Sequence, residues 1–240
     1  MFTVALIGPD GAGKTTIGRR LEHTLPLPVK YVYMGINVDS SNYMLPTTRL
    51  IRAIKRARGA PPDNAGPPDP RRVKPSPKGI IKRTVSSVKS GLRLINRLAE
   101  EWYRQGLAWN YRRLGNIVLF DRHFFSDYYA YHIATGGQGR PLGDRIHGFM
   151  LAHIYPKPDL VIYLDAPAEV LFARKGEGTI TALERRRQEY FQMRNLVKNF
   201  TVVDASQPED DVTRKVTGLI WDFYRAKIGE QQMRVRDVEG

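Results

Sequence analysis

A glycine-rich segment near the start of the sequence carries residue types that bind phosphate. Ile7 to Thr16 reads I-G-P-D-G-A-G-K-T-T, which has the spacing G-x-x-x-x-G-K-[ST]. In such a loop the glycines let backbone N–H groups face phosphate oxygens, the lysine reaches the β- and γ-phosphates, and the hydroxyl ligates Mg²⁺. An apolar run precedes the segment and a helical pattern follows it, as a phosphate-binding loop requires. The residues predicted to bind nucleotide phosphates and Mg²⁺ are Gly8, Gly11, Ala12, Gly13, Lys14, Thr15 and Thr16.

Two strands predicted farther along the chain end in aspartate. Asp121 ends the run I-V-L-F-D, and Asp165 ends the run L-V-I-Y-L-D. A carboxylate at the carboxyl end of a strand beside the phosphate loop faces the phosphate site and can ligate Mg²⁺. Arg122 follows directly, and its planar fork suits a phosphorylated acceptor. We therefore predict Lys14, Asp121 and Arg122 as catalytic residues. Thr15 and Asp121 are the predicted metal ligands, whereas Asp165 is more typical of a solvated strand end.

The elements that must position these residues alternate along the chain. Apolar runs predict strands at residues 2–7, 29–34, 116–121, 159–165 and 200–204. Helical spacing predicts helices at 15–25, 45–58, 80–114, 141–155, 167–174, 181–197 and 208–226. Short strands that are apolar throughout indicate a parallel sheet covered on both faces. We expect an α/β fold of three layers with a five-stranded parallel sheet.

Length and composition set the class of protein. A chain of 240 residues with 42% hydrophobic content can form one domain with a sizeable core, and we expect a single domain over residues 1–240. The sequence has no cysteine, which excludes disulfides and thiolate metal sites. Its five histidines show no ligand spacing for a metal, although His123 follows Arg122 and would lie at the site. Without a signal peptide or an apolar run of membrane-spanning length, the protein is expected to be soluble and cytoplasmic.

Most of the positive charge is concentrated in one stretch. The formal net charge is +14, yet from Arg49 to Arg97 there are 14 lysines and arginines against two aspartates. Two amphipathic helical patterns flank a proline-rich segment at 59–79, which we expect to be a loop because it has few large apolar residues. We interpret residues 45–97 as a basic insertion that contacts a polyanion or an anionic surface. The alternative is a solvated excursion that only keeps the protein soluble.

Four segments resemble the thymidylate kinases, a family of P-loop nucleoside monophosphate kinases. Gly8 to Thr16 is similar to that family's phosphate loop, and D-R-H-F-F-S from Asp121 to Ser126 is similar to its D-R-[YH]-x-x-S motif. P-D-L-V-I-Y-L-D, which ends at Asp165, resembles its fourth strand. V-V-D-A-S-Q, which ends at Gln207, resembles the strand and loop that pass the adenine. Together the four segments are far more specific than the phosphate loop alone.

The resemblance implies roles for further residues. It implies ATP and Mg²⁺ as cofactors, a P-loop NTPase-type fold, a small-molecule acceptor and a homodimer. It places Asp10 near the acceptor's sugar or Mg²⁺, and Ala205, Ser206 and Gln207 near the adenine. It places Asp121, Arg122 and Ser126 near a phosphorylated acceptor. It also implies that residues 174–187 form a lid over ATP.

The basic residues of this lid can supply charge that the reaction needs. Transfer of a phosphoryl group needs positive charge beyond Mg²⁺ and the loop lysine, and residues 9–12 of the loop supply none. We therefore predict that the closed lid supplies it through one or more of Arg174, Lys175, Arg185 and Arg186. The alternative is that the arginines at 185–187 form a solvated helix face.

Departures from the family concern the acceptor. M-G-I-N-V-D, which starts at Met34, replaces the T-R-E-P-G-G-like segment of thymidylate kinases. The F-A-A-D-R-like helix has only E-W-Y-R, with Tyr103 and Arg104, in the right neighbourhood, and we predict that these two residues bind the acceptor. The aromatic residues Trp102, Tyr103, Tyr128 and Tyr131 line an acceptor pocket or belong to the core. The acceptor therefore does not follow from the sequence.

Three interpretations of function stay open. The first is a kinase that phosphorylates a nucleoside monophosphate or a related small acceptor, supported by the four segments. The second is a kinase on the same scaffold whose acceptor is a sugar, a glycolipid or another metabolite, supported by the missing segments. The third is an ATP-dependent protein that binds nucleic acid or a membrane surface, for which the basic insertion is the only support.

Overall fold

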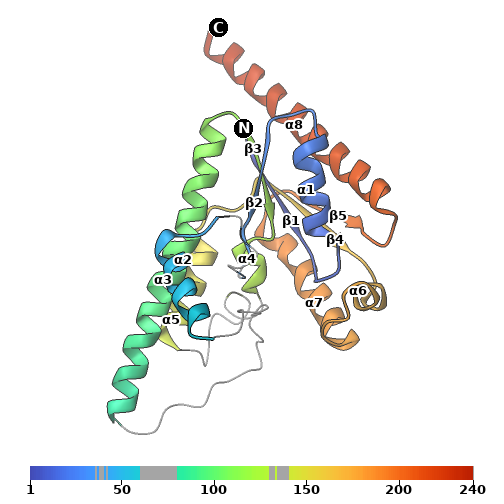
Figure 1. The fold of residues 1–240 in the computed structure, drawn as a ribbon. Coiled ribbons are helices and arrows are strands. Elements are labelled where there is room, and N and C mark those ends of the chain that lie inside the picture. The colour runs from blue at the N-terminus through green and yellow to red at the C-terminus, as the bar shows by residue number, and fades with distance from the viewer. Residues whose placement is uncertain are drawn as a thin grey trace.

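Five parallel strands form the sheet at the centre of the computed structural model (Figure 1). They are β1 (Thr3–Ile7), β2 (Val29–Tyr33), β3 (Ile117–Asp121), β4 (Leu160–Asp165) and β5 (Phe200–Asp204). The structure describes residues 1–35, 37, 41, 43–59, 80–129, 133 and 141–239, and of residues 55, 80–89 and 230–239 it describes the backbone alone. The strand order is β2-β3-β1-β4-β5, so the strand before the phosphate loop lies in the middle. The predicted five-stranded parallel sheet is confirmed.

Both faces of the sheet are buried, which explains why its strands are apolar throughout. On β1, Val4 and Leu6 belong to one hydrophobic cluster, while Ala5 and Ile7 belong to a second cluster on the other face. Successive side chains of a strand point to opposite faces, so a strand that is covered twice needs apolar residues at every position. A strand with one solvated face would alternate polar and apolar residues. These strands do not alternate, because both of their faces are buried.

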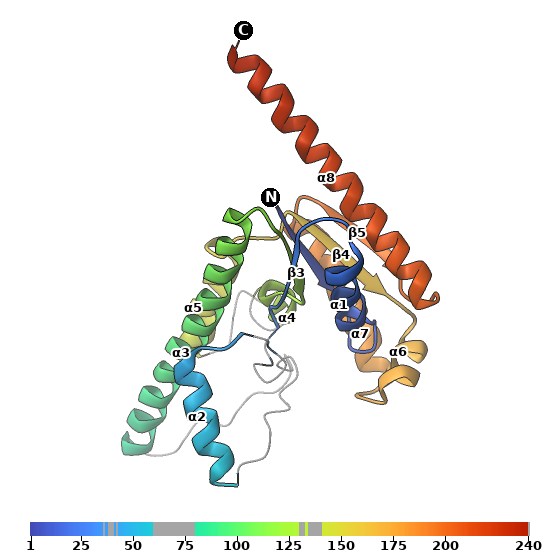
Figure 2. The same ribbon diagram turned by 45° about the horizontal axis from the view of Figure 1, so that its top comes forward.

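Helices cover the two faces of the sheet and complete three layers. Helix α1 (Lys14–Thr24) and helix α8 (Glu209–Glu239) pack against the first cluster through Ile17, Leu21 and Val216. Helices α3 (Ile80–Arg113), α5 (Leu142–His153) and α7 (Ile180–Gln192) contribute Ala108, Leu151 and Tyr190 to the second cluster. Figure 2 shows α1 and α8 on the opposite side of the sheet from α3 and α5. The predicted three-layer fold of the P-loop NTPase type is confirmed.

Two helix boundaries differ from the sequence prediction. The last helix was expected to end near residue 226, but α8 continues to Glu239 and extends beyond the sheet (Figure 2). The predicted helix at 181–197 is divided into α7 and a 3-10 turn, η3 (Met193–Leu196). The apolar pattern that marks a packed helix fades after residue 226, so periodicity alone cannot place the end of a helix that leaves the core.

The basic insertion contains two helices that flank an undescribed stretch. Helix α2 (Pro46–Ala57) lies beside the middle of α3, and Leu45 N–H donates to the carboxylate of Glu100 on α3. Both helices were predicted, and both are present. The predicted proline-rich loop at 59–79 lies outside the described residues except for Gly59. Among the described residues no helix has the length and apolar character needed to cross a membrane.

Candidate active site

The phosphate loop connects β1 to α1 at the middle of the sheet. Gly8, Gly11 and Gly13 all have positive φ angles, of 150°, 88° and 83°. A Cβ atom on Gly11 would lie 2.6 Å from the carbonyl oxygen of Leu171, and one on Gly8 would clash with the carbonyl oxygen of Leu164. The loop therefore needs glycine at these positions for both backbone conformation and space.

Lys14 is the first residue of α1 and lies beneath the loop. Its side chain is buried, and Nζ donates a 2.7 Å hydrogen bond to the carbonyl oxygen of Pro9. The pKa of Lys14 is lowered to about 8, mainly by burial and also by the nearby charge of Arg122, while the carboxylates of Asp10 and Asp121 oppose this shift. A buried ammonium of this kind gains most from an anionic ligand, which matches the predicted contact with nucleotide phosphates.

Asp121, at the end of β3, meets the first turn of α1. Its Oδ2 accepts a 2.6 Å hydrogen bond from the hydroxyl of Thr15 and another of 2.6 Å from the hydroxyl of Tyr31 on β2. Burial raises the pKa of the Tyr31 phenol and the adjacent carboxylate raises it further, so the phenol stays a proton donor to Asp121. Three elements therefore hold this carboxylate in one orientation.

The residues at this point fit a Mg²⁺ ion. Asp121 is fully buried, and its second oxygen, Oδ1, accepts no hydrogen bond from the described residues. A buried carboxylate oxygen without a donor, beside a threonine hydroxyl under a phosphate loop, is a suitable arrangement for a hard cation. Within the described ranges no group of three or more carboxylate or imidazole ligands is present. Such a group is not needed where phosphates and water complete the coordination of Mg²⁺.

Arg122 directly follows Asp121, the last residue of β3. It has a φ of 69°, and its N–H donates to the carbonyl oxygen of Leu6 on β1. Its guanidinium forms an ion pair with Asp10, and Lys175 Nζ lies 3.6 Å from the same carboxylate. Burial raises the pKa of Asp10, but the charges of Arg122, Lys14 and Lys175 lower it by more, so the carboxyl stays ionised. The structure thus brings Asp10 and Arg122 together, and the roles predicted for them stay predictions.

A second carboxylate faces Arg122 from the other side. Asp127 ends the short helix α4 (Phe124–Asp127), is buried, and lies 3.9 Å from Arg122 Nη1 through Oδ1. Arg186 on α7 approaches the same residue, because its Nη2 lies 3.5 Å from the Asp127 carbonyl oxygen. Asp127 was not among the site residues predicted from the sequence. Its position directly after the D-R-H-F-F-S segment was the available signal.

The predicted lid consists of two helices joined by a turn. Helix α6 (Ala168–Lys175) ends beside the phosphate loop, and α7 starts at Ile180. Arg174 Nη1 donates a 2.7 Å hydrogen bond to the carbonyl oxygen of Ala205, and Nη2 lies 3.4 Å from the carbonyl oxygen of Ser206. The end of α6 is therefore linked to the loop that was predicted to pass the adenine.

The remaining arginines of the lid differ in position. Arg185 is partly exposed and lies 3.9 Å from Glu189, so it is the nearest of the three to the solvated face considered for this run. Arg186 is more buried, lies 3.2 Å from Glu189 and packs over the ring of Tyr190. Arg187 forms two 2.8 Å hydrogen bonds to the two carboxylate oxygens of Asp165. Arg186 is also the arginine that approaches Asp127 through its guanidinium.

The pair of Arg187 and Asp165 shows what the sequence analysis missed. Asp165 was expected to be a solvated end of β4, and Arg187 was not selected as a site residue. The structure instead joins them in a bidentate ion pair that fixes α7 to the carboxyl end of β4. Hydrogen bonding to Asp165 is the main cause that raises the pKa of Arg187. The acidic strand end and the basic run were both visible, but their pairing depends on how α7 crosses the sheet.

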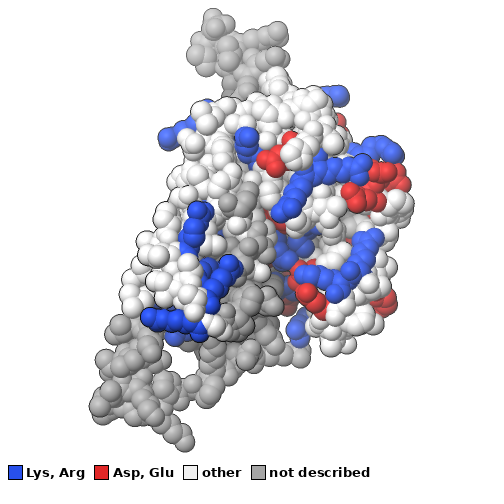
Figure 3. Space-filling view, in the orientation of Figure 1, with Lys and Arg blue, Asp and Glu red and all other residues white. Residues whose placement is uncertain are grey.

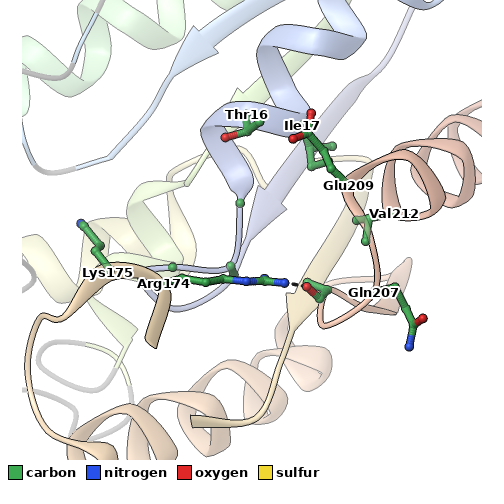
Figure 4. A pocket seen from close by; sticks show the side chains of 11 residues that line it. Thr16, Ile17, Arg174, Lys175, Gln207, Glu209 and Val212 are labelled. Carbon is green, nitrogen blue, oxygen red and sulfur yellow. Dashed lines mark hydrogen bonds between the residues drawn. The ribbon is translucent and has the colours of Figure 1, made fainter. Parts of the chain in front are cut away.

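A cavity of about 420 Å³ opens beside the phosphate loop (Figure 4). In Figure 4, Arg174 extends toward the loop after β5, whereas Lys175 points away from that loop. Ser206 is not among the residues that line the cavity, and its hydroxyl and N–H both donate to Asp204. The cavity joins the phosphate loop to the predicted adenine loop, and its walls are formed by Gly11, Ala12, Gly13, Thr16, Ile17, Arg174, Lys175, Ala205, Gln207, Glu209 and Val212.

Four residues near the predicted acceptor site have other contacts in the structure. Arg104 is buried, donates to the carbonyl oxygens of Gly35 and Tyr33 at 2.9 and 3.4 Å, and packs over the ring of Phe124. The Ser126 hydroxyl donates to the carbonyl oxygen of His123 at 2.7 Å. His123 is itself buried, accepts from the N–H of Phe125, and has a pKa lowered to about 3 by burial. Tyr103 is half-buried on α3, near Tyr43.

These contacts place Arg104, Ser126 and His123 in supporting positions around Arg122. The acceptor roles predicted for Tyr103, Arg104 and Ser126 stay predictions. Of the four aromatic residues considered for the pocket, Tyr128 is buried in the second hydrophobic cluster, and Trp102 packs against that cluster. Tyr131 lies outside the described residues.

Comparisons with known proteins agree on one family. A family model described as "Thymidylate kinase" matches residues 99–216. A protein of Archaeoglobus fulgidus named "Probable thymidylate kinase" is 32% identical over 118 residues, which cover 47% of this chain and 57% of that protein. "Probable thymidylate kinase 1" of Saccharolobus solfataricus is 32% identical over 111 residues, covering 44% and 54%. "Thymidylate kinase" of Pseudoalteromonas translucida is 31% identical over 121 residues, covering 46% and 56%.

The match covers part of each protein. The chain spans a little more than half the length of these relatives. The family model begins within α3 and ends within α8, so it includes Asp121, Arg122 and the lid but not the phosphate loop. The phosphate loop is therefore an independent feature that agrees with the match.

Proposed function

Because the chain is a divergent member of the thymidylate kinase family, we propose that it is an ATP-dependent phosphotransferase. It moves the γ-phosphate of ATP to a nucleoside monophosphate or a related small acceptor. The observation that carries this proposal is the contact of Thr15 with Asp121 beneath the phosphate loop, where one carboxylate oxygen has no donor among the described residues. That arrangement offers a metal position next to a cavity large enough for a nucleotide's phosphates.

Each side of the loop has a distinct task in this proposal. Lys14 and the backbone N–H groups of the loop bind the β- and γ-phosphates, and Ala205 to Gln207 pass the adenine. Thr15 and Asp121 would hold Mg²⁺, which would supply positive charge beside the phosphates. Arg174, Lys175 and Arg186 supply the remaining positive charge to the group in transfer. Of these, Lys175 already lies beside Asp10 at the edge of the loop.

The acceptor binds on the side of Arg122 and Asp10. Arg122 presents two guanidinium nitrogens between Asp10 and Asp127, so it can orient a polar group of the acceptor. Arg104 does not need to touch the acceptor to matter here. Its hydrogen bonds to Gly35 and Tyr33 hold the end of β2 against Arg122, so it acts as a positioning residue.

The test is a direct measurement of phosphoryl transfer. Purified protein is incubated with Mg-ATP and one acceptor at a time from a panel of nucleoside monophosphates, sugars and sugar phosphates. ADP release and the mass of the product are followed together. We expect acceptor-dependent ADP release that is lost in Lys14→Ala and kept in Lys198→Ala, which alters an exposed lysine. No acceptor-dependent release with any compound would contradict the proposal.

A second candidate acceptor is supported by Asp127. Its buried carboxylate lies beside Arg122, so an acceptor phosphate bound to Arg122 would also approach a negative charge. An uncharged hydroxyl acceptor, such as a sugar or a glycolipid, would meet no such repulsion. The same panel distinguishes the two acceptors. Transfer to a sugar hydroxyl, with none to nucleoside monophosphates, would favour the second.

Two further parts of the proposal concern partners. The basic insertion contacts an anionic surface or polyanion, as its excess of lysine and arginine suggests. The resemblance to the family suggests a homodimer, and light scattering after size-exclusion chromatography measures the mass that tests it. An ATP-dependent binder of nucleic acid or membrane that transfers no phosphate is the remaining alternative. It would show binding without acceptor-dependent ADP release.

A further inference from the structure

Helix α2 presents an apolar face to solvent. Leu50, Ile51 and Ile54 are 63%, 49% and 44% exposed, and Leu50 and Ile54 are one turn apart. The side of the helix nearer the protein carries Thr48, which is buried and donates to Asn96 on α3 at 3.3 Å. The helix therefore rests on α3 through a polar contact and leaves its aliphatic side chains without cover among the described residues.

The charges around this apolar face all have one sign. Arg49, Arg56 and Arg58 are exposed, and residues 41–62 include no aspartate or glutamate. Among the residues that are described, Figure 3 shows lysine and arginine but no aspartate or glutamate over the part of the surface where α2 lies. An exposed patch that combines large aliphatic side chains with exposed arginines is atypical of a solvated surface.

The neighbouring part of α3 has the same character. Leu92 and Ile95 are 62% and 64% exposed, and Arg93 lies between them. From residue 80 to residue 99 the sequence again has no acidic residue. The two helices of the insertion thus share one chemistry on their outer surfaces, basic and aliphatic.

We propose that α2 docks on an anionic lipid surface, with Leu50, Ile51 and Ile54 in the interface and the arginines at the headgroups. An amphipathic helix with aliphatic residues on one face and basic residues on the other lies in the plane of such a surface. The strength of binding then comes from apolar burial together with attraction to anionic lipid. This inference deepens the proposed contact of the insertion with an anionic partner. It does not rest on the phosphotransferase activity.

The exposed aliphatic residues favour lipid over nucleic acid. A phosphate backbone would use the arginines but would gain nothing from Leu50 and Ile54. Proteins that bind single strands add aromatic side chains on which bases stack, and residues 45–99 contain no aromatic residue. A lipid surface is the partner that uses both components of the patch.

The experiment measures binding of the full chain to vesicles by cosedimentation. Vesicles of phosphatidylcholine alone are compared with vesicles that also contain phosphatidylglycerol, at low and high salt. We expect binding to the anionic vesicles that weakens with salt, and little binding to the neutral ones. Heparin and double-stranded DNA serve as soluble polyanions in parallel.

Two sets of variants separate the apolar component from the charge. Arg49→Gln, Arg56→Gln and Arg58→Gln together should weaken vesicle binding by about 100-fold, since each basic residue near such a surface contributes about fivefold. The matched control removes three exposed charges elsewhere, at Arg113, Arg194 and Lys215. We expect the control to retain most of the binding.

The second set tests the aliphatic face. Leu50→Gln with Ile54→Gln should weaken vesicle binding by about tenfold or more and leave heparin binding unchanged. The control, Leu114→Gln with Leu142→Gln, alters two other exposed leucines. Circular dichroism and thermal unfolding confirm that each variant is folded.

Each alternative outcome overturns the inference in a recognisable way. Binding to heparin or DNA that ignores the leucine variants would leave an anionic partner but exclude lipid. Self-association that is lost in Leu50→Gln with Ile54→Gln would identify a second copy of the chain as the occupant. No binding to vesicles or polyanions would remove both this inference and the proposed anionic partner, and the kinase proposal would stand apart from it.

Discussion

Replacing Lys14 with methionine should stabilise the nucleotide-free protein while abolishing phosphoryl transfer. Lys14 is buried, and its pKa falls from the ordinary value of 10.5 to about 8, mainly through burial. A shift of that size corresponds to about 3 kcal/mol, because one pKa unit equals about 1.4 kcal/mol. The ammonium of Lys14 is therefore poorly hydrated in the folded, nucleotide-free protein, whereas water hydrates it well in the unfolded chain.

The net gain is smaller than this electrostatic cost. Methionine has a similar length and helix propensity, but it cannot donate to the carbonyl oxygen of Pro9 as Lys14 does at 2.7 Å. A hydrogen bond of this kind contributes about 1 kcal/mol net. We expect Lys14→Met to raise the free energy of unfolding by about 2 kcal/mol, or the melting temperature by about 4 to 8 °C for a chain of this size.

The sign of the pH dependence gives an independent check. Below about pH 8 the lysine is protonated in both folded and unfolded protein, so its full cost is present. As the pH rises from about 8 toward 10.5, the folded protein loses the proton first and the cost declines. The difference in stability between Lys14→Met and the unmodified protein should therefore be largest near neutral pH and shrink in alkaline solution.

The assay is thermal unfolding over this pH range, without nucleotide and with Mg-ATP. Lys198→Met, an exposed substitution, is the control and should change stability little. Mg-ATP should stabilise the unmodified protein more than Lys14→Met, because the lysine then contacts phosphate. A Lys14→Met variant that melts below the unmodified protein at every pH would refute the reasoning. A stability difference between the two proteins that is the same near neutral pH and in alkaline solution would also refute it.

Other substitutions test the remaining parts of the site. Asp121→Asn should lower kcat by on the order of a hundredfold or more and raise the Mg²⁺ concentration needed for half-maximal activity, and an unchanged Mg²⁺ requirement would contradict its predicted role. Arg122→Ala should weaken acceptor binding by a few kcal/mol with little effect on ATP, measured as KM for each substrate, and equal effects would place Arg122 elsewhere. Among lid variants, Arg174→Ala or Arg186→Ala should lower kcat by on the order of a hundredfold with little change in ATP affinity, and near-normal kcat in both would exclude these arginines as the source of charge. Gly35→Ala should raise the KM of the acceptor, because its Cβ would lie 2.6 Å from Cδ of Arg122, and an unchanged KM would show that this contact adapts freely.

Local patterns predicted the elements, and the structure supplied their contacts. The run from Ile117 to Asp121 is apolar because β3 is buried on both faces, so its sequence alone predicts a strand. Nothing in that run states that β3 lies between β2 and β1. The order of the strands depends on the helices and loops that connect them. The phosphate loop identifies only the first of these connections, the one that leaves β1.

The parts of the site whose residues are neighbours in the sequence could be predicted. The loop from Gly8 to Thr15 works through its own backbone, so its pattern was enough. The pair of Asp165 and Arg187 spans two elements, and a shift of one residue along α7 would have brought another arginine of the run to the carboxylate. Likewise, the burial of Arg104 depends on the end of β2, which is far away in sequence.

The two hydroxyls that meet at Asp121 affect more than metal binding. Thr15 and Tyr31 come from α1 and β2, so the orientation of the carboxylate is fixed by the packing of the sheet. The conformational entropy of Asp121 is therefore lost once, when the chain folds, and not again each time a nucleotide binds. A carboxylate already oriented in this way needs no reorganisation when charge develops on the phosphates, which is the condition under which an electrostatic contact lowers an activation barrier most.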